Sequence, residues 1–399
     1  MDNILHVGLD VGSTTVKIIV MNEENKTIYK NYQRHYSDTK NTVFNLLEEL
    51  NNKYPSSNFT LALTGSGAIS VAKFLGVNFI QEVVSCKRAV EKYIPQTDVV
   101  IELGGEDAKI IYFDKSIEQR MNGTCAGGTG AFIDQMASLL HTDTSGLNEL
   151  AKNYKMIYPI ASRCGVFAKT DIQPLINEGA AREDIAASIF QAVVNQTISG
   201  LACGRPIRGK VAFLGGPLTY LSELRKRFIE TLKLTPDEII VPEEAHLLVA
   251  KGAALDSINE DYITNDELSK KIINLRNSTD NTTHPLDPLF KSEEDYREFD
   301  KRHKKATVKK QDLKTYKGDC FIGIDAGSTT TKLVLIDRDG ALLFSLYGSN
   351  EGNPLKSTIN MLKKLYDVIP EAAKLRYSGV TGYGEKLIQT ALNIDLGEI

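Results

Sequence analysis

The chain has 399 residues, which is too long for one ordinary domain and enough for two or three. Hydrophobic residues make up 42% and charged residues 25%, the balance of a soluble globular protein, and a net charge of −4 argues against nucleic acid or an anionic membrane as a partner. The sequence has no run of about 18 apolar residues and no signal-peptide pattern at its start. We therefore expect a cytoplasmic protein that does not span a membrane.

Strands and helices are expected to alternate over the first 255 residues. A strand at 4–11, a Gly-Ser-Thr-Thr turn and a strand from 16 open the chain, and a second strand–turn–strand unit occupies 98–113. The apolar pattern predicts the other elements of this part: strands at 27–32, 59–65, 211–216 and 238–242, and helices at 40–52, 67–75, from about 130, from about 164, at 183–203, 220–233 and 243–255. Two such halves, each led by a hairpin, predict an α/β fold of two lobes with a central cleft.

The beginning of the chain recurs near its end. Residues 6–17 read HVGLDVGSTTVK and residues 321–332 read FIGIDAGSTTTK, an offset of 315, and the later segment VTGYG matches LTGSG of the first copy. The second copy contains neither a second glycine hairpin nor an equivalent of FLGG, so we expect that it cannot close a nucleotide cleft alone. Because the sequence stops abruptly within this copy, we also expect the chain to be part of a longer protein.

A charged stretch separates the two copies. It contains NSTDNTTHPLDP and KRHKKATVKK and is poor in long apolar runs, which is typical of an exposed linker with some helix near 292–305. The predicted organisation is a complete first domain at 1–255, a linker at 256–318 and a partial second domain at 319–399.

The first turn has the residues of a phosphate-binding hairpin that begins at Asp10. Glycine allows close approach of the backbone, and N–H groups and hydroxyls can donate to phosphate oxygens from four consecutive residues, namely Gly12, Ser13, Thr14 and Thr15. Lys17 on the following strand either reaches a phosphate or is solvated, and the same alternatives hold for Lys109 after the second turn.

The second hairpin repeats this plan with Glu102, Gly104, Gly105, Glu106 and Asp107. Two carboxylates that face one triphosphate, here Asp10 and Glu102, suit Mg²⁺ bound through its waters. Either Glu106 or Asp107 is placed to orient the attacking water, and the sequence does not decide between them.

A third element, Gly215-Gly216-Pro217, ends a strand in a bare turn against which an adenosine could lie. Each piece alone also fits an ordinary turn or tight packing, but the three in this order predict an ATP site. The set resembles the superfamily of actin, sugar kinases and heat-shock ATPases, which implies a two-lobed fold of duplicated ribonuclease H-like subdomains. No Walker A sequence occurs, which argues against a P-loop enzyme.

Two of the five cysteines are candidates for an iron–sulfur site. Cys125 in GTCAGGTGAF and Cys164 in SRCGVFAKTD each precede a predicted helix, whose N-terminus favours a thiolate and an anionic cluster. A [4Fe–4S] cluster needs four ligands, which two chains related by a two-fold axis would supply. Cys86, Cys203 and Cys320 are expected to be buried and structural, although a zinc site of four cysteines stays open.

The motifs over residues 4–255 resemble the BadF/BadG/BcrA/BcrD-type ATPases, specifically the activators of 2-hydroxyacyl-CoA dehydratases, and the duplication resembles the long members of that family. The resemblance rests on DVGSTTVK, ELGGEDAK, GTCAGGTGAF, SRCGVFAKTD and FLGGPL. It implies that Cys125 and Cys164 share one [4Fe–4S] cluster between two protomers. It also implies that ATP hydrolysis drives one electron from a ferredoxin or flavodoxin into a dehydratase-like iron–sulfur protein.

Two positions depart from the family pattern, and two other functions stay open. The small activators usually have Asp where this chain has Glu102 and often Gln where it has Glu106, which leaves the water-orienting residue uncertain. A small-molecule kinase of the same superfamily would need a catalytic Asp, for which Asp107 or Asp134 could serve, and would leave the two cysteines without a role. An ATP-switched scaffold would bind no iron.

Overall fold

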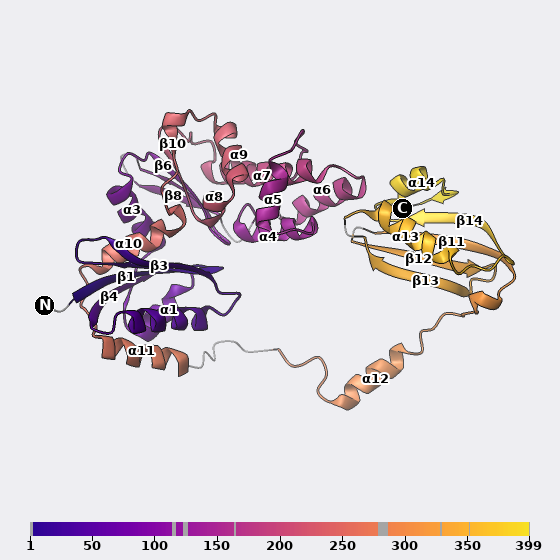
Figure 1. The fold of residues 1–399 in the computed structure, drawn as a ribbon, viewed down its shortest axis with the longest axis horizontal. Helices are drawn as coiled ribbons and strands as arrows, with labels where there is room; N and C mark the ends of the chain where they lie inside the picture. Colours follow the sequence, from indigo (N-terminus) through magenta and orange to yellow (C-terminus); the bar gives the residue numbers. More distant parts are fainter. Residues whose placement is uncertain are drawn as a thin grey trace. The chain divides into compact units, whose positions relative to one another are not determined.

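The computed structural model describes residues 3–113, 117–122, 127–162, 165–277, 286–327, 329–350 and 352–398. The chain divides into two compact units (Figure 1). Unit 1 comprises Met1–Ser138, Thr142–Ala168 and Ala186–Thr279, and unit 2 comprises Leu139–His141, Lys169–Ile185 and Asp280–Ile399.

The first lobe of unit 1 is a five-stranded mixed sheet in the order β3-β2-β1-β4-β5. Its strands are β1 (Asn3–Val11), β2 (Thr15–Met21), β3 (Thr27–Arg34), β4 (Ser57–Thr64) and β5 (Asn78–Phe79). β1 pairs with β2 in an antiparallel hairpin and with β4 in parallel. From Leu5 to Val11 every residue of β1 is buried, because helices cover both faces of the sheet.

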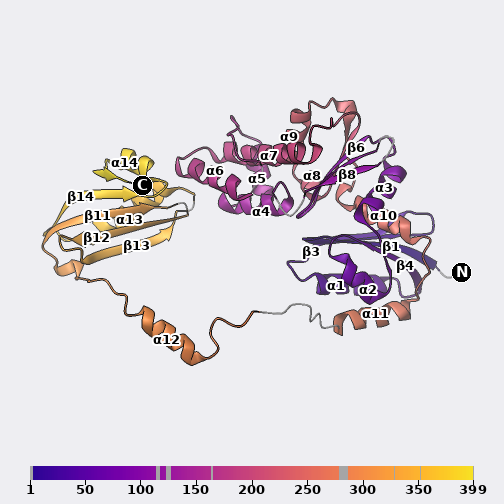
Figure 2. The same ribbon diagram turned by 180° about the vertical axis from the view of Figure 1, so that it is seen from behind.

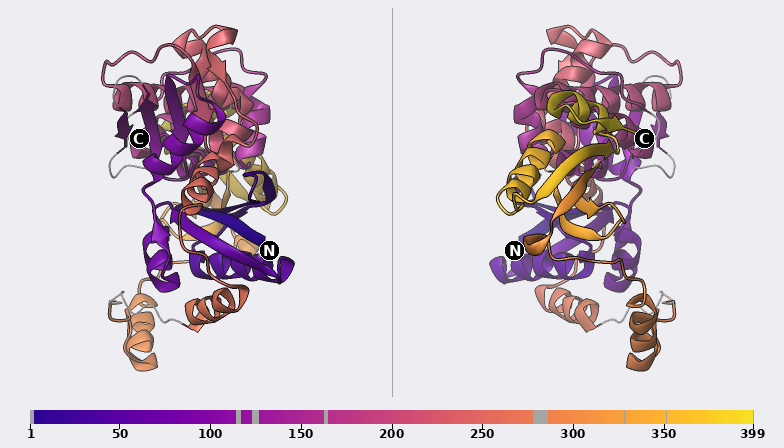
Figure 3. Two further views of the ribbon diagram at one scale, coloured as in Figure 1. Left: turned by 90° about the vertical axis from the view of Figure 1, so that its left-hand side faces the viewer. Right: turned by 90° about the vertical axis from the view of Figure 1, so that its right-hand side faces the viewer.

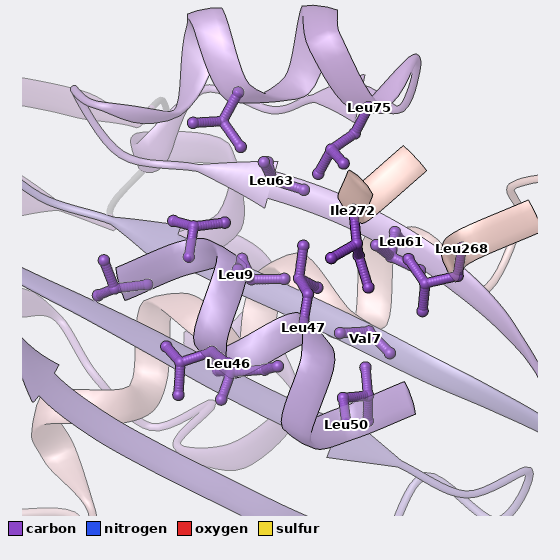
Figure 4. Packing of buried hydrophobic residues seen from close by; sticks show 14 of the residues in the cluster. Val7, Leu9, Leu46, Leu47, Leu50, Leu61, Leu63, Leu75, Leu268 and Ile272 are labelled. Carbon is purple, nitrogen blue, oxygen red and sulfur yellow. The ribbon is translucent and has the colours of Figure 1, made fainter. Parts of the chain in front are cut away.

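One face of this sheet is covered by α1 (Thr39–Lys53) and α2 (Ala68–Leu75). The side chain of Asp38 accepts a hydrogen bond from the N–H of Asn41 and so fixes the start of α1. Apolar residues at helical spacing on α1 then face the sheet (Figure 4); those that pack there include Leu46, Leu47 and Leu50.

The chain beyond residue 255 contributes to the same core. Ile263 forms a bridge with Phe59, and α11 (Asn265–Asn277) packs Leu268, Ile272 and Leu275 into the cluster. Figures 1, 2 and 3 agree in placing α11 beside α1. The boundary at 255 stays a prediction, but the stretch that follows it is not a free linker, because its first helix is part of the first lobe.

The second lobe repeats the hairpin-led plan in a sheet of order β10-β9-β6-β7-β8. Its strands are β6 (Val99–Leu103), β7 (Ala108–Tyr112), β8 (Glu118–Met121), β9 (Val211–Leu214) and β10 (Ile239–Ile240). The helices that lie between β8 and β10 in the chain are α4 (Gly130–Leu139), α5 (Thr144–Ala151), α6 (Gly165–Asn177), α7 (Arg182–Thr197), α8 (Gly216–Tyr220) and α9 (Ser222–Leu232). As in the first lobe, the central strand pairs with its hairpin partner in antiparallel and with a later strand in parallel.

Two helices, α3 (Glu82–Tyr93) and α10 (Leu248–Ser257), pack against each other; both contribute to the core of the second lobe, and α10 also packs on β1, β2 and β4 of the first lobe. Their contacts need residues without a side chain. A Cβ on Gly252 would lie 1.8 Å from the carbonyl oxygen of Ser85 in α3, and a Cβ on Gly8 of β1 would lie 2.2 Å from the carbonyl oxygen of Ala250. The backbones of α10, α3 and β1 are therefore in direct contact, which ties the two lobes together.

Unit 2 contains a third sheet of order β13-β12-β11-β14-β15, the strand order of the first lobe. Its elements are β11 (Gly318–Ala326), β12 (Thr330–Asp337), β13 (Leu342–Ser349), α13 (Pro354–Tyr366), β14 (Ala373–Thr381), α14 (Glu385–Leu392) and β15 (Leu396–Gly397). Residues of α13 and α14 form a core with one face of this sheet. On the other face, residues of β11 and β12 are half exposed, so buried and half-exposed residues alternate along both strands. The helix α12 (Glu293–His303) precedes the sheet.

The α/β fold class predicted from the sequence is confirmed, including the two hairpin-led lobes and the additional sheet of the second copy. In the described part of the chain, one helix, Arg182–Ala202, is long and apolar enough to cross a membrane by length and composition alone. Of its most apolar window, 67% is buried inside the molecule, and the core helix of a soluble protein passes the same test.

Candidate nucleotide site

The turn between β1 and β2 is closed by a hydrogen bond from the N–H of Gly12 to the carbonyl oxygen of Thr15, at 2.9 Å. Asp10 and Lys17 stand opposite each other in the strand register, and Lys17 Nζ lies 2.6 Å from Asp10 Oδ2. Asp10 is 1% exposed. A buried carboxylate and a lysine thus stand directly beneath the glycine turn.

The hairpin of β6 and β7 has the same plan, except that its lysine forms an ion pair with a residue outside the hairpin. The N–H of Gly104 donates to the carbonyl oxygen of Asp107 at 2.7 Å, and Glu102 stands opposite Lys109. The ammonium of Lys109, however, lies 2.6 Å from Glu82 Oε1, at the first residue of α3. Glu82 was absent from the sequence-based site, because nothing in its neighbourhood in the sequence marks it as a site residue.

The two hairpins approach each other through glycine. A Cβ on Gly105 would lie 2.2 Å from Thr14 Oγ1 of the first turn. The backbone N–H groups of Gly130 and Ala131, at the start of α4, donate to the carbonyl oxygens of Gly104 and Gly105 at 3.0 and 2.7 Å. The start of α4 therefore fixes the second turn in its place opposite the first.

The third predicted element lies between β9 and α8. Gly215 has a φ of +87°, and a Cβ there would lie 2.1 Å from the carbonyl oxygen of Leu103, so glycine is required. Pro217 occupies the first turn of α8, where its missing N–H costs nothing. The ring of Tyr32 contacts the position where a Cβ of Gly216 would stand.

These elements enclose a cavity of about 240 Å³ within unit 1. Twelve of the fourteen predicted catalytic and nucleotide-binding residues line it: Gly12, Ser13, Thr14, Thr15, Lys17, Glu102, Gly104, Gly105, Asp107, Gly215, Gly216 and Pro217. The other two do not: Asp10 lies behind Lys17, and Glu106 is exposed. Of the two candidates for orienting the attacking water, therefore, Asp107 lines the cavity and Glu106 does not.

Aromatic rings form part of the wall near the third element. Tyr32, Tyr220 and His246 line the cavity, with ring centroids of His246 at 5.2 Å from Tyr32 and 5.1 Å from Tyr220. Burial lowers the pKa of His246, which favours its neutral ring. The flat, apolar faces of such rings suit a planar base.

Each of the two buried carboxylates, Asp10 and Glu102, has one oxygen that accepts no hydrogen bond from the described residues. Among the described residues, Asp10 Oδ1 and Glu102 Oε2 are buried oxygens without a hydrogen-bond donor. Burial raises the pKa of Glu102 to about 7, against the attraction of Lys109 and Lys17. Burial likewise raises the pKa of Asp10, against the attraction of Lys17. Uncompensated carboxylate oxygens of this kind fit a hard divalent cation as their missing partner.

The raised pKa of Glu102 predicts a pH dependence of stability for the protein free of nucleotide and metal. An acid that binds its proton more tightly in the folded than in the unfolded chain loses stability as the pH rises between the two pKa values. From pH about 4.5 to about 7, this group should lower the free energy of unfolding by at most about 3 kcal/mol. The measurement is denaturant unfolding at pH 5 and pH 8 for the wild type and Glu102→Gln; equal pH dependence in both would contradict it.

Both cysteines predicted to hold a cluster, Cys125 and Cys164, lie outside the described residues. α6 begins at Gly165, directly after Cys164, and α4 begins at Gly130, five residues after Cys125. In the described part of the chain there is no group of three or more His, Cys, Asp or Glu side chains placed to hold a metal ion.

The expected burial of the other three cysteines holds for two of them. Cys86 and Cys320 are buried in apolar cores. The expectation for Cys203 was wrong: it is exposed, with a left-handed φ of +45°. The long apolar helix changes to a π-helical turn at Ile198–Ala202, and Cys203 caps it, with its thiol donating to the carbonyl oxygen of Gly200. The burial of Cys203 was predicted from the spacing of apolar residues in an α-helix, and a π-helical turn changes that spacing.

A comparison with protein families identifies the chain. The model of the BadF/BadG/BcrA/BcrD ATPase family matches residues 7–256, more than half of the chain. The chain belongs to this family. The matched range contains both hairpins, the third element and every residue that lines the cavity, whereas the second copy lies outside it.

Several similar proteins have names that state an activity. The chain is 31% identical to the 2-hydroxyisocaproyl-CoA dehydratase activator of Clostridioides difficile, over 64% of this chain and 95% of the relative. It is 33% identical to the (R)-2-hydroxyglutaryl-CoA dehydratase activating ATPase of Acidaminococcus fermentans, over 54% and 83%.

Solved structures of the same two kinds of protein resemble this one. The (R)-2-hydroxyglutaryl-CoA dehydratase component A of Acidaminococcus fermentans matches with a TM-score of 0.56 and 26% identity, over 67% of this chain and 99% of that one. The activator of the 2-hydroxyisocaproyl-CoA dehydratase from Clostridium difficile, solved with bound ADPNP, matches with a TM-score of 0.55 and 26% identity, over 69% and 99%.

Proposed function

We propose that this ATPase is an activator that uses ATP hydrolysis to transfer one electron to a 2-hydroxyacyl-CoA dehydratase-type, or related, iron–sulfur partner. The observation that carries the proposal is the cleft of two glycine hairpins, each with a buried acid and a lysine, in a chain whose relatives are named as dehydratase activators. The predicted ATPase domain at 1–255 and partial second ATPase-like domain at 319–399 belong to the same proposal, whereas the predicted linker at 256–318 is shortened at its start, because α11 packs into the first lobe.

ATP would lie in the cavity with its phosphates between the two turns. The N–H groups and hydroxyls of residues 12–15 and the N–H groups of Gly104 and Gly105 would donate to phosphate oxygens, and the aromatic wall with Gly215 to Pro217 would receive the adenosine. Mg²⁺ fits Asp10 and Glu102, because each presents a buried oxygen without a partner, and it would neutralise phosphate charge in the transition state. Asp107, which lines the cavity, would orient the attacking water.

Cys125 and Cys164 would hold a [4Fe–4S] cluster together with the same two residues of a second copy in a homodimer. Their places before α4 and α6 suit an anionic cluster, since helix N-termini favour negative charge. When bound, the cluster would supply a low-potential electron. α4, which begins five residues after Cys125 in the sequence, is held to the second turn by the hydrogen bonds from Gly130 and Ala131 to Gly104 and Gly105, so a change at the phosphates would act on this helix. The donor would be a ferredoxin or flavodoxin, and the site of action the cytoplasm.

The test is the content of iron and acid-labile sulfide in the full chain, purified without oxygen. We expect about two irons per chain, since two chains share four, and we expect Cys125→Ala to contain none while still binding ATP. Cys203→Ala is the matched control, because it removes an exposed thiol outside the proposed cluster and should leave the iron unchanged. Absence of iron from the wild type after anaerobic reconstitution, with ATP hydrolysis intact, would instead leave a kinase or a scaffold.

A further inference from the structure

His35 lies next to the first phosphate turn and touches it twice. It follows β3 and is 7% exposed. Its ring nitrogen Nε2 lies 3.2 Å from the carbonyl oxygen of Gly12, and its backbone N–H donates to the carbonyl oxygen of Thr14 at 3.2 Å. One residue thus holds two of the four residues of the turn from the side.

The hydrogen bonds of the ring determine which nitrogen carries the proton. The backbone N–H of Ser37 donates to Nδ1 at 3.1 Å, so Nδ1 acts as an acceptor. In a neutral ring the proton is then on Nε2, which donates to the carbonyl oxygen of Gly12. Ser37, which makes this contact, has a left-handed backbone with a φ of +67°, a conformation that is unfavourable for residues other than glycine.

The second copy of the chain makes the same set of bonds with a different side chain. Asn350 stands 315 residues after His35, the offset that relates the two turns. Its Nδ2 donates to the carbonyl oxygen of Gly327 at 2.9 Å, and its backbone N–H donates to the carbonyl oxygen of Thr329 at 3.0 Å. Its Oδ1 accepts from the N–H of Gly352 at 3.2 Å, where φ is +70°.

Each bond of His35 therefore has a counterpart at the same offset, with an imidazole replaced by an amide. Both groups are planar and present a donor nitrogen and an acceptor atom that are separated by one carbon atom. His35 and Asn350 share five features, namely three hydrogen bonds, a left-handed residue two positions later, and burial, since Asn350 is 3% exposed. Such agreement would be unexpected if the side chain only filled space. The shared chemistry indicates that the donor to the first glycine carbonyl is what the position requires.

This donor orients the phosphate-binding side of the turn. In a trans peptide the C=O of one residue and the N–H of the next point in opposite directions. When His35 holds the carbonyl of Gly12, it aims the N–H of Ser13 away from the ring. Ser13 lines the cavity. Fixing donors before the ligand arrives lowers the entropic cost of binding it.

We propose that His35 is a positioning residue for the phosphates of the nucleotide, acting through the carbonyl of Gly12. The proposal rests on the proposed ATP site and specifies what keeps that site ready to bind. A side chain that lacks the donor should leave the turn closed by its Gly12–Thr15 bond but free to rotate its peptides.

The experiment compares the dissociation constants of ATP and of adenosine for the full-length wild type, His35→Ala and His35→Asn. We expect His35→Ala to bind ATP about 5- to 30-fold more weakly, the effect of one or two kcal/mol. We expect adenosine, which has no phosphates, to bind all three equally. His35→Asn introduces the residue of the second copy and should bind ATP within about twofold of the wild type.

Two further variants complete the design. Asn350→Ala removes the corresponding bonds in unit 2 and should leave ATP binding unchanged. If His35→Ala does not fold, His35→Leu replaces it, because leucine is close in size to asparagine, uncharged and without a donor. Unchanged ATP binding in the donor-free variant, an equal loss for adenosine, or an asparagine variant as weak as alanine would each overturn the positioning role. A wild type that does not bind ATP would instead refute the proposed function itself.

Discussion

Replacing Asp10 by asparagine should reduce the rate of ATP hydrolysis by about 100-fold or more. The substitution keeps the shape of the side chain but removes the negative charge, which Lys17 faces at 2.6 Å and which we assign to binding Mg²⁺. Loss of one group that stabilises charge in a water-excluded transition state typically costs 10² to 10³ in rate, in order of magnitude. The measurement is phosphate release at saturating ATP and Mg²⁺, with binding of ATP measured separately.

The second copy offers a matched control for this prediction. Asp325 pairs with Lys332 at 2.9 Å, as Asp10 pairs with Lys17, but it is 44% exposed and belongs to a copy in which we expect no complete cleft. Asp325→Asn should hydrolyse ATP at the wild-type rate. If Asp10→Asn retained more than about a tenth of the activity, Asp10 would not hold the Mg²⁺ that we assign to it.

Gly8→Ala is expected to have the largest effect on stability, about 3 kcal/mol or more. The added Cβ would lie 2.2 Å from the carbonyl oxygen of Ala250 and 2.3 Å from the backbone nitrogen of Ala254. Both are backbone atoms of a helix that also touches α3, so no side chain can rotate away and α10 must move off the sheet. Calorimetric unfolding of the full chain would show this as a lower midpoint for the transition of unit 1.

Gly323→Ala places the same change at the same position of the second copy. There the nearest atom to the new Cβ is Val334 Cγ2 at 3.1 Å, the end of a side chain that can give way. We expect less than about 1 kcal/mol, with either sign, because alanine also reduces the freedom of the unfolded chain. Equal effects of the two substitutions would show that contact with α10 is not what keeps residue 8 a glycine.

The parts of the fold and site that the sequence predicted are those encoded by adjacent residues. The two hairpins and the bare turn before α8 follow from short runs of glycine with hydroxyl or acidic residues, and the described structure brings them around one cavity. In contrast, α11 was assigned to a charged linker, although the spacing of Leu268, Ile272 and Leu275 is that of one helical face and could have revealed it. The segment has few apolar residues overall, and for that reason it was interpreted as a linker, but a helix needs only a narrow apolar stripe to pack against a core.

Contacts between distant segments could not be predicted in this way. Glu82 belongs to the site because α3 begins beside Lys109, 27 residues away in the sequence, and nothing local to Glu82 indicates it. His35 stands outside every motif, and its role becomes visible when the bonds of the two copies are compared. The exposure of Cys203 depended on a π-helical turn, which no apolar periodicity indicates.

The two copies also differ in how their backbones should fluctuate. β1 is buried on both sides along most of its length, whereas β11, with the same strand neighbours, has one face partly open to water. Opening of a hydrogen-bonded ladder costs less free energy where fewer apolar contacts must be broken with it. The amide hydrogens of β11 should therefore exchange with solvent faster than those of β1. The same sequence motif thus occurs twice in one chain, in a strand buried on both faces and in a strand that should open more easily. The buried copy is the one that lines the cavity.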